Sequence, residues 1–268
     1  MLNLHGNPID CQDAGEGPAV LFLPGSYSTA AAWRPVQRLL LPGLRLVTTS
    51  LCGYGGTADT RNRQDANIRH EVQVVEALAH HIGQPVHLVG HSFGGTVALA
   101  AALAGTFPVA SLALFEANPL PLIEHRDSGT LYRETLAMSR GFEAAVAAGE
   151  PDAPGRIIDF WGGAGAFAAM PEAVQTYCRQ TAAVNVLDWH SDFGMAVTTA
   201  DLAALDMPVL LVRGALANPA MVQITESLRA ALPRVQHAAV EGAGHFLVST
   251  HAAACAGMLG SFLGLAGP

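Results

Sequence analysis

The stretch HLVGHSFGGTVAL, residues 87–99, combines a serine with glycines at a spacing that suits nucleophilic chemistry. Ser92 is the centre of a G-x-S-x-G pattern, between an apolar run that predicts a strand and a small-residue run that predicts a helix. A serine on such a sharp turn projects its hydroxyl above a sheet, and the N–H groups of the following helix favour negative charge beside it. We therefore predict that Ser92 is a nucleophile, with a purely structural turn as the alternative.

The sequence contains eleven histidines, and His245 is the one placed to serve a serine nucleophile as general base. It follows the apolar run 235–241, which predicts a strand, and lies in a glycine-flanked loop after Ser92 in chain order. From there it would take the proton of Ser92 and return it to the leaving group. His80 and His87 lack metal-ligand spacing, and no HExxH pattern is present, so neither a metal nor a cofactor is expected.

Besides the serine motif, three segments in matching order resemble segments of the α/β-hydrolase superfamily, and the resemblance covers nearly the whole chain. They are LFLPGSYSTAAAW (21–33), similar to the oxyanion loop; SLCGYGGTAD (50–59), similar to D-x-x-G-x-G-x-S with Ser50 for Asp and Thr57 for Ser; and EGAGHFLV (241–248), similar to the segment that presents the catalytic histidine. The resemblance implies a triad in the chain order serine, acid, histidine.

The resemblance also implies an oxyanion hole made of two backbone N–H groups. One belongs to Phe93, directly after the nucleophile, and the other to Ser26 or to Tyr27 in the oxyanion loop. The family's usual histidine in that loop is Pro24 here, which removes no chemical group from the site. Because they adjoin these groups, Tyr27 and His91 are expected to contact the substrate.

The acid of the triad is missing from its usual position. The segment PVLLVRGALANPAMV (208–222) predicts a strand, a loop and a helix, and the resemblance implies an aspartate in the loop, which offers only Asn218. Glu116 instead ends the predicted strand 109–116, at the carboxyl edge of the sheet where active sites gather. Some α/β-hydrolases place a glutamate after this strand, so we predict Glu116 as the acid.

Other assignments of the acid stay open. Instead of serving as the triad acid, Glu116 could form an ion pair with an arginine of the following segment. The competing acids are Glu241 and the aspartates near the end of that segment, whereas Asp206 precedes a strand and would lie at the wrong edge of the sheet. A Ser–His dyad oriented by Asn218 is a further alternative. The residues concerned are Arg126 and Arg133 as ion-pair partners, and Asp188, Asp192 and Asp201 as competing acids.

The surrounding elements alternate between short apolar runs and longer helical patterns, which predicts an α/β fold. Its sheet is expected to be mostly parallel and doubly wound, with helices on both faces. Residues 1–116 and 206–268 would form this α/β-hydrolase core. Residues 117–205 show helical patterns and no convincing strand, so they are expected to form a helical lid inserted after one strand. Trp161 and Phe193, among the aromatic residues of this lid, are expected to face an apolar substrate pocket.

Composition restricts the partners. Only 13% of the residues are charged, compared with roughly 25% in a typical soluble domain, which favours a large buried core and is compatible with a homodimer. The net charge of −8 argues against nucleic acid. The uncharged stretch 96–115 is interrupted by GTFP, which predicts a helix followed by a strand and no membrane span. Four unpaired cysteines and a start without a secretory pattern predict a cytoplasmic protein.

Together these observations predict a cytoplasmic serine hydrolase for a small apolar acyl or ring-cleavage substrate. Ester, thioester, lactone and carbon–carbon bonds are all compatible with a serine nucleophile, whereas epoxide hydrolases and haloalkane dehalogenases of this superfamily use an aspartate there. Two alternatives stay open. One is an acyltransferase or perhydrolase that uses the same site, and the other is a ligand-binding protein that has lost catalysis.

Overall fold

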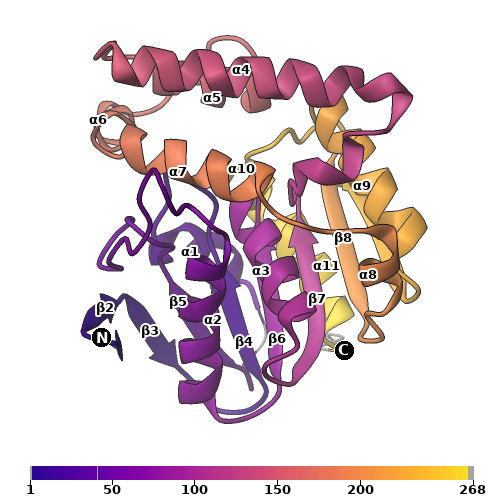
Figure 1. The fold of residues 1–268 in the computed structure, drawn as a ribbon. Helices are drawn as coiled ribbons and strands as arrows, with labels where there is room; N and C mark the ends of the chain where they lie inside the picture. The colour runs from indigo at the N-terminus through magenta and orange to yellow at the C-terminus, as the bar shows by residue number, and fades with distance from the viewer. Residues whose placement is uncertain (1, 41, 265–268) are drawn as a thin grey trace.

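A seven-stranded sheet forms the centre of the molecule in the computed structural model, which describes residues 2–40 and 42–264 (Figure 1). All its strands are parallel except the first, which pairs antiparallel with its neighbour. In spatial order they are β3 (Cys11–Ala14), β5 (Arg45–Thr49), β4 (Ala19–Leu23), β6 (Val86–His91), β7 (Val109–Phe115), β8 (Val209–Gly214) and β9 (Val235–Val240). A separate antiparallel pair, β1 (Leu2–Leu4) and β2 (Asn7–Ile9), precedes the sheet.

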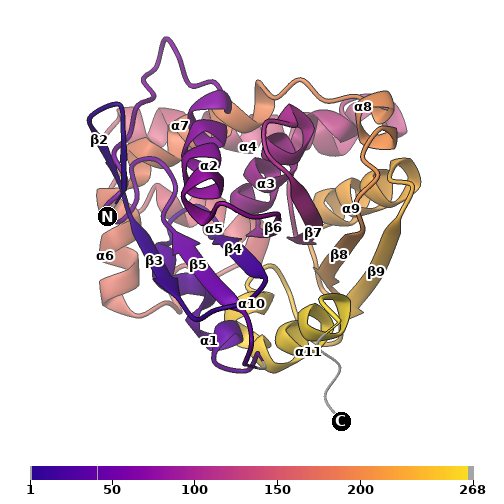
Figure 2. The ribbon, with the colours of Figure 1, turned by 90° about the horizontal axis from the view of Figure 1, so that it is seen from below.

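Helices cover both faces of the sheet (Figure 2). One face carries α2 (Arg69–Ile82), α3 (Phe93–Ala104) and α9 (Pro219–Ala231), and the other carries η1 (Ala30–Trp33), α1 (Arg34–Gln37), α10 (Leu247–Thr250) and α11 (Ala252–Phe262). The buried side chains of β4 alternate between two apolar cores, with Leu21 and Leu23 on the first face and Val20 and Phe22 on the second. The prediction of an α/β fold with helices on both faces is therefore confirmed.

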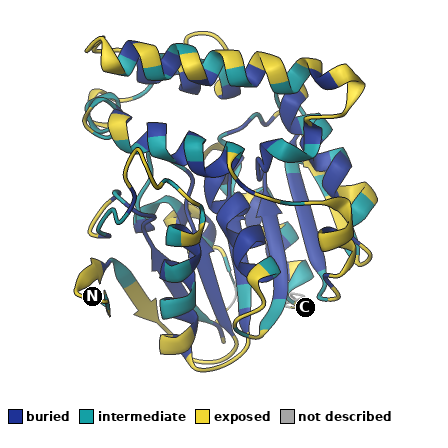
Figure 3. Cartoon of the chain, viewed as in Figure 1, coloured by how far each residue is buried: buried dark blue, intermediate teal, exposed yellow. Residues whose placement is uncertain are grey.

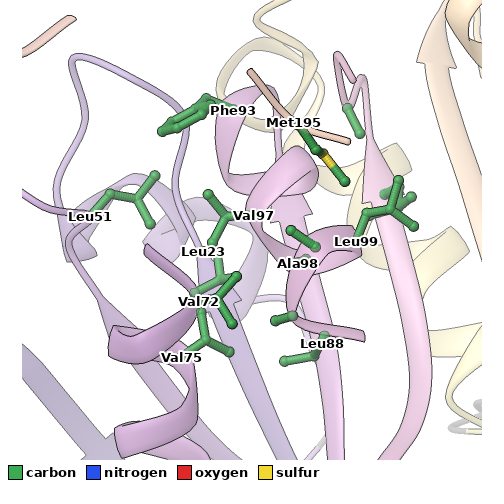
Figure 4. Packing of buried hydrophobic residues seen from close by; sticks show 14 of the residues in the cluster. Leu23, Leu51, Val72, Val75, Leu88, Phe93, Val97, Ala98, Leu99 and Met195 are labelled. Atoms are coloured by element: carbon green, nitrogen blue, oxygen red, sulfur yellow. The ribbon is translucent and has the colours of Figure 1, made fainter. Parts of the chain in front are cut away.

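The apolar core beneath α2 and α3 is drawn in Figure 4. Leu88 of β6 and Leu23 of β4 pack there against Val75 of α2 and Val97 of α3. Met195, which follows the last long helix before β8, belongs to the same cluster. The segment between β7 and β8 is thus packed onto the hydrophobic core of the sheet, so the core and that segment share one apolar interior.

Residues 117–205, which we call the helical insertion, contain helices and no strand. They form a layer above the sheet, and the outward face of its longest helix is exposed (Figures 1 and 3). Its elements are η2 (Leu120–Ile123), η3 (Asp127–Gly129), α4 (Thr130–Ala147), α5 (Pro154–Gly162), α6 (Glu172–Gln180), α7 (Ala182–Phe193) and α8 (Thr199–Ala203). The sheets and the remaining helices lie in the described parts of residues 1–116 and 206–268, and residues 1, 41 and 265–268 lie outside the described residues.

Glycine and proline residues mark several of the element boundaries. The uncharged stretch 96–115 divides into α3 and β7, with Gly105 in the left-handed conformation at the end of the helix, as predicted. Within the described ranges, no helix is long and apolar enough to cross a membrane. Residues 30–37 form η1 and then α1, with Pro35 in the first turn of α1, and His251 separates α10 from α11.

Candidate active site

Ser92 lies on the turn between β6 and α3, in a backbone conformation that residues other than glycine rarely adopt. Its φ is 53° and its ψ is −128°, and a geometry of this kind costs about 1–3 kcal/mol. The Ser92 N–H donates to the carbonyl of Phe115 at 3.0 Å, and the N–H of Gly95 donates to the Ser92 carbonyl at 2.8 Å. The neighbouring strand and helix thus hold the strained turn in place.

Close packing explains the glycines around the serine. A Cβ atom on Gly94 would lie 2.2 Å from the carbonyl oxygen of Pro24, and a Cβ atom on Gly90 would lie 2.3 Å from that of Gly94. Both distances are far below van der Waals contact, so neither position has room for a side chain. The first turn of α3 can therefore approach the loop that follows β4.

Three of the predicted residues form a continuous chain of hydrogen bonds. His245 Nε2 lies 3.0 Å from Ser92 Oγ, and His245 Nδ1 lies 2.7 Å from Glu116 Oε2. Because a carboxylate can only accept, Nδ1 carries the hydrogen of the neutral imidazole and Nε2 presents a lone pair to the serine hydroxyl. All three side chains are buried. The geometry suits removal of a proton from Ser92 during nucleophilic attack.

Glu116 directly follows β7, with a positive φ of 47°. Burial raises the pKa of its carboxyl, but the hydrogen bond from His245, the charge of that residue and the N–H of Gly214 outweigh this effect and leave the pKa below its ordinary value. The Gly214 N–H donates to Oε1 at 2.7 Å. Across residues 2–40 and 42–264, no ion pair joins Glu116 to Arg126 or Arg133. The carboxylate is therefore ionised and directed at the histidine.

The other acids considered from the sequence have different neighbours. Asp201 caps the first turn of α8, and Glu241 is exposed after β9. Asp188 and Asp192 are buried in α7 and take part in the contacts described below. In the described parts of the chain, none of these four carboxylates forms a hydrogen bond with His245.

Asn218 occupies the loop in which an aspartate was expected. Its Oδ1 accepts the N–H of Ala220 at 2.8 Å and so caps the start of α9, while its Nδ2 donates to the carbonyl of Phe160 at 2.8 Å. Both ends of the amide are thus engaged in joining α9 to the helical insertion. This residue has a structural role in the described contacts, and the orienting contact to the histidine comes from Glu116.

Two backbone N–H groups are available beside the serine. Neither the N–H of Phe93 nor that of Ser26 has a hydrogen-bond acceptor among the described residues. Phe93 begins α3, so its N–H also lies at the positive end of the helix dipole. Both residues line the same cavity as Ser92. Within the described chain, the two N–H groups predicted as oxyanion donors are thus without acceptors beside Ser92, and their role stays a prediction.

A buried ionic cluster lies behind the oxyanion loop. Arg61 Nη1 lies 2.7 Å from Asp188 Oδ1 and 3.0 Å from Glu71 Oε1, and its Nε lies 3.0 Å from Asp59 Oδ1. Burial opposes the charge of Arg61, but the carboxylates outweigh it and raise the pKa of the guanidinium. Burial is also the main reason why the pKa values of Asp188 and Glu71 are raised. The cluster holds more carboxyl groups than the single cation can neutralise.

Asp188 connects this cluster to the site. Its Oδ2 accepts the hydroxyl hydrogen of Ser26 at 2.6 Å and that of Tyr54 at 2.7 Å. The side chain of Ser26 is thus tied to α7, while its backbone N–H stays free in the cavity. Through Asp188, the helical insertion fixes the position of a predicted oxyanion donor.

Ser92 and His245 open onto a cavity between the sheet edge and the helical insertion. Its volume is ≈ 60 Å³, room for about four water-sized groups at 10–15 Å³ each. Apolar side chains form most of its wall. The lining residues are Ser26, Tyr27, Ser92, Phe93, Asn118, Ile157, Ile158, Trp161, Asn185, Asp188, Trp189, Asp192, His245 and Phe246.

The four residues predicted to contact substrate divide into two pairs. Tyr27 and Trp161 line the cavity, and the indole of Trp161 stacks on His245 with 5.4 Å between ring centroids. His91 does not line it; its Nε2 lies 2.8 Å from the His245 carbonyl oxygen, and burial lowers its pKa to about 4. Phe193 stacks against Trp189, away from the cavity lining. His91 and Phe193 therefore contact residues that line the cavity, but do not line it themselves.

Four polar residues of the cavity, Asn118, Asn185, Asp188 and Asp192, were not predicted as substrate contacts. Asp192 was considered only as a triad acid, and Asn118 was not singled out, although it lies two positions after Glu116. Both are buried. Burial, and secondarily the charge of Asp188, raises the pKa of Asp192 well above its ordinary value, which favours the protonated form of this carboxyl. Only the structure shows that these polar residues are buried beside the same cavity, so the sequence alone offers no means of finding them.

The substitution Asp192→Asn is expected to stabilise the protein at pH 8 and to have little effect near pH 4. A carboxyl whose pKa is raised in the folded state favours folding at low pH, and this contribution is lost as the pH rises above the ordinary carboxyl range, because the unfolded chain can ionise. Asparagine has no such penalty. We expect a gain of about 2–4 °C in melting temperature at pH 8, corresponding to ~1 kcal/mol. The exposed Asp206→Asn serves as control; equal shifts in both variants would contradict the prediction.

Within residues 2–40 and 42–264, no group of three or more histidine, cysteine, aspartate and glutamate side chains is arranged to hold a metal ion. The four cysteines are free thiols, and three of them are buried. The chemical groups of the site are therefore the serine, the imidazole, the carboxylates and the backbone donors already described.

The order of the sheet, the helices on its two faces and the strand–turn–helix at Ser92 define the class of this protein, the α/β-hydrolase fold. The sequence matches the alpha/beta hydrolase family over residues 20–258. The chain therefore belongs to that family, and the family predicted from the four sequence segments is confirmed.

The individual relatives of known name share about a third or less of their aligned residues with this chain. The chain is 31% identical over 103 residues to protein phosphatase methylesterase 1 of Mus musculus, covering 36% of this chain and 26% of that protein. It is 31% identical over 147 residues to 2-hydroxymuconate semialdehyde hydrolase of Pseudomonas sp. (strain CF600), covering 52% and 48%. The chain thus spans less than half the length of these relatives. The structure of bromoperoxidase from Bacillus anthracis has the same fold, with a TM-score of 0.76, 21% identity, and coverage of 96% and 99%.

Proposed function

We propose that this protein is a serine hydrolase that cleaves carboxylic esters with a short acyl group. The observation that carries the proposal is the unbroken chain from Ser92 Oγ through His245 to Glu116, with distances of 3.0 Å and 2.7 Å. Family membership and the hydrolytic relatives agree with it. Neither of those relatives' substrates is assigned to this chain.

In the proposed reaction, His245 Nε2 takes the hydroxyl proton as Ser92 Oγ attacks the ester carbonyl carbon. The N–H groups of Phe93 and Ser26 donate to the oxygen that becomes negative. His245 then gives its proton to the departing alkoxide, which leaves an acyl group on Ser92. Water repeats the sequence with the same groups and releases the acid, while Glu116 stabilises the imidazolium in both steps.

The size of the cavity sets the expected acyl group. A volume of ≈ 60 Å³ leaves room beside the serine for a few non-hydrogen atoms. Long acyl chains would need the helical insertion to move, and we propose that this insertion acts as the lid of the site. Acetate and butanoate esters are therefore the expected substrates, in preference to octanoate esters.

A fluorophosphonate probe tests the nucleophile directly, because it reacts only with an activated serine and needs no knowledge of the substrate. Intact-mass analysis should show one adduct per chain in the wild type and none in Ser92→Ala. Hydrolysis of para-nitrophenyl acetate should be lost in the same variant, and Ser249→Ala, on the short helix α10, serves as a matched control that labels normally. A wild type that is not labelled would overturn the proposal and favour a ligand-binding role.

A further inference from the structure

Besides the Tyr27 hydroxyl, which can donate or accept, two side chains of the cavity have hydrogen-bonding groups without a partner among the described residues. Asp192, on α7, is 2% exposed, and Asn118, just after β7, is 5% exposed. Both line the cavity that contains Ser92. Buried polar groups without partners are costly, so each such group in a site indicates what a ligand can supply.

The unused group of Asp192 is a donor. Its Oδ1 accepts the N–H of Leu120 at 3.2 Å, whereas its Oδ2 has no partner among the described residues. Oδ2 is the oxygen without a partner, and burial raises the pKa of this carboxyl, which favours the protonated form with its hydrogen on Oδ2. An O–H group of this kind needs an acceptor oxygen or nitrogen.

The unused group of Asn118 is a donor as well. Its Oδ1 accepts the hydroxyl hydrogen of Thr96 at 3.2 Å. Its Nδ2 has no hydrogen-bond acceptor within residues 2–40 and 42–264, which leaves two N–H donors. Asn118 lies two positions before Leu120, whose N–H is bonded to Asp192, and both side chains line the same cavity.

The remaining lining restricts the charge of a ligand. Among the described lining residues there is no lysine or arginine, while Asp188 contributes a carboxyl group. A carboxylate in the ligand would enter a mostly apolar cavity without a facing cation. An uncharged oxygen, by contrast, can accept from both donors, because a carbonyl oxygen has two lone pairs.

We propose that Asp192 and Asn118 form an acceptor-oxygen subsite, which binds an uncharged ketone or ether oxygen in the acyl group of the substrate. This inference rests on the proposed ester hydrolysis at Ser92 and narrows its substrate class to short oxo- or alkoxy-acyl esters. Both residues determine specificity and take no part in bond cleavage. A plain acyl group of the same shape leaves both donors unpaired and is therefore the poorer substrate.

Two isosteric substrate pairs test the subsite. Para-nitrophenyl levulinate carries a ketone where the isocaproate ester has a branching methyl group, and the methoxyacetate ester carries an ether oxygen where the butanoate ester has a methylene. The ratio of kcat/KM within each pair is measured for the wild type and for Asp192→Leu, Asp192→Asn and Asn118→Leu. Intrinsic differences in ester reactivity are common to all the enzymes and cancel in the comparison.

In at least one pair, Asp192→Leu and Asn118→Leu are each expected to lower the ratio about tenfold, while Asp192→Asn, which keeps a donor, stays close to the wild type. Fluorophosphonate should still label Ser92 in all three variants, which shows that they are folded. Ratios that do not change in either pair, with labelling intact, would overturn the subsite alone. A wild type without labelling would overturn the proposed hydrolysis itself.

Discussion

Replacing Glu116 by glutamine is expected to lower kcat/KM for short esters by a factor on the order of 10⁴, the loss typical of a triad whose acid is made neutral without a change of shape. The amide can still accept the N–H of Gly214 through its oxygen. Its NH₂ group, however, would face His245 Nδ1, which now lies 2.7 Å from a carboxylate oxygen. A donor at that position favours the tautomer with the hydrogen on Nε2, so the imidazole can no longer accept the proton of Ser92.

The measurement is steady-state hydrolysis of para-nitrophenyl butanoate, together with the rate of fluorophosphonate labelling, which should fall with it. Two control variants address the rival acids: Glu241→Gln changes an exposed carboxylate, and Asn218→Ala removes the amide in the loop where an aspartate was expected. The second variant loses a helix cap and with it about 1 kcal/mol of stability, but should keep its activity. A large loss in either control, with Glu116→Gln nearly unaffected, would contradict Glu116 as the acid.

The chemistry at the ends of the strands could be predicted because the parallel topology alone brings these ends to one edge. Ser92 follows β6, Glu116 follows β7 and His245 follows β9, and local patterns in the sequence marked each strand. A displaced acid was recognisable for the same reason, since a carboxylate at the end of an apolar strand needs a partner nearby. The contact between the acid and the histidine then depends on strand order rather than on distance along the chain.

The polar groups under the helical insertion could not be predicted in this way. Arg61 bonds to Asp188, which lies 127 positions further along the chain, and no local pattern marks either residue as buried. The same holds for Asp192, whose partner is the backbone of η2. Amphipathic periodicity places apolar faces, but it does not show where two irregular segments meet. Phe193 illustrates the limit. Its apolar character suggested a place in the pocket wall, but the sequence could not show which face of the helix lines the cavity.

Replacing Arg61 by methionine is expected to reduce the free energy of unfolding by about 3–5 kcal/mol, because removal of one partner from a buried ion cluster leaves uncompensated charges. The Arg61 side chain is fully buried, and its guanidinium is the cation shared by Asp188, Glu71 and Asp59. Urea unfolding followed by circular dichroism measures the loss. Arg63→Met is the matched control, because its side chain is 60% exposed and its contact with Glu143 is 3.6 Å long; a surface pair of this kind contributes about 0–1 kcal/mol.

The origin of the loss can be separated by pH and by compensating substitutions. Without Arg61, Asp188 and Glu71 would both be carboxyl groups with raised pKa values in the folded state, so the defect should be smallest near pH 4 and should grow as the pH rises. Neutralising them in Arg61→Met/Glu71→Gln/Asp188→Asn should recover much of the loss at pH 8, since the penalty comes from unpaired charge. A defect that is independent of pH and persists in the triple variant would instead attribute the role of Arg61 to packing. In that case Asp188 would not depend on this cation to hold Ser26 in the oxyanion loop.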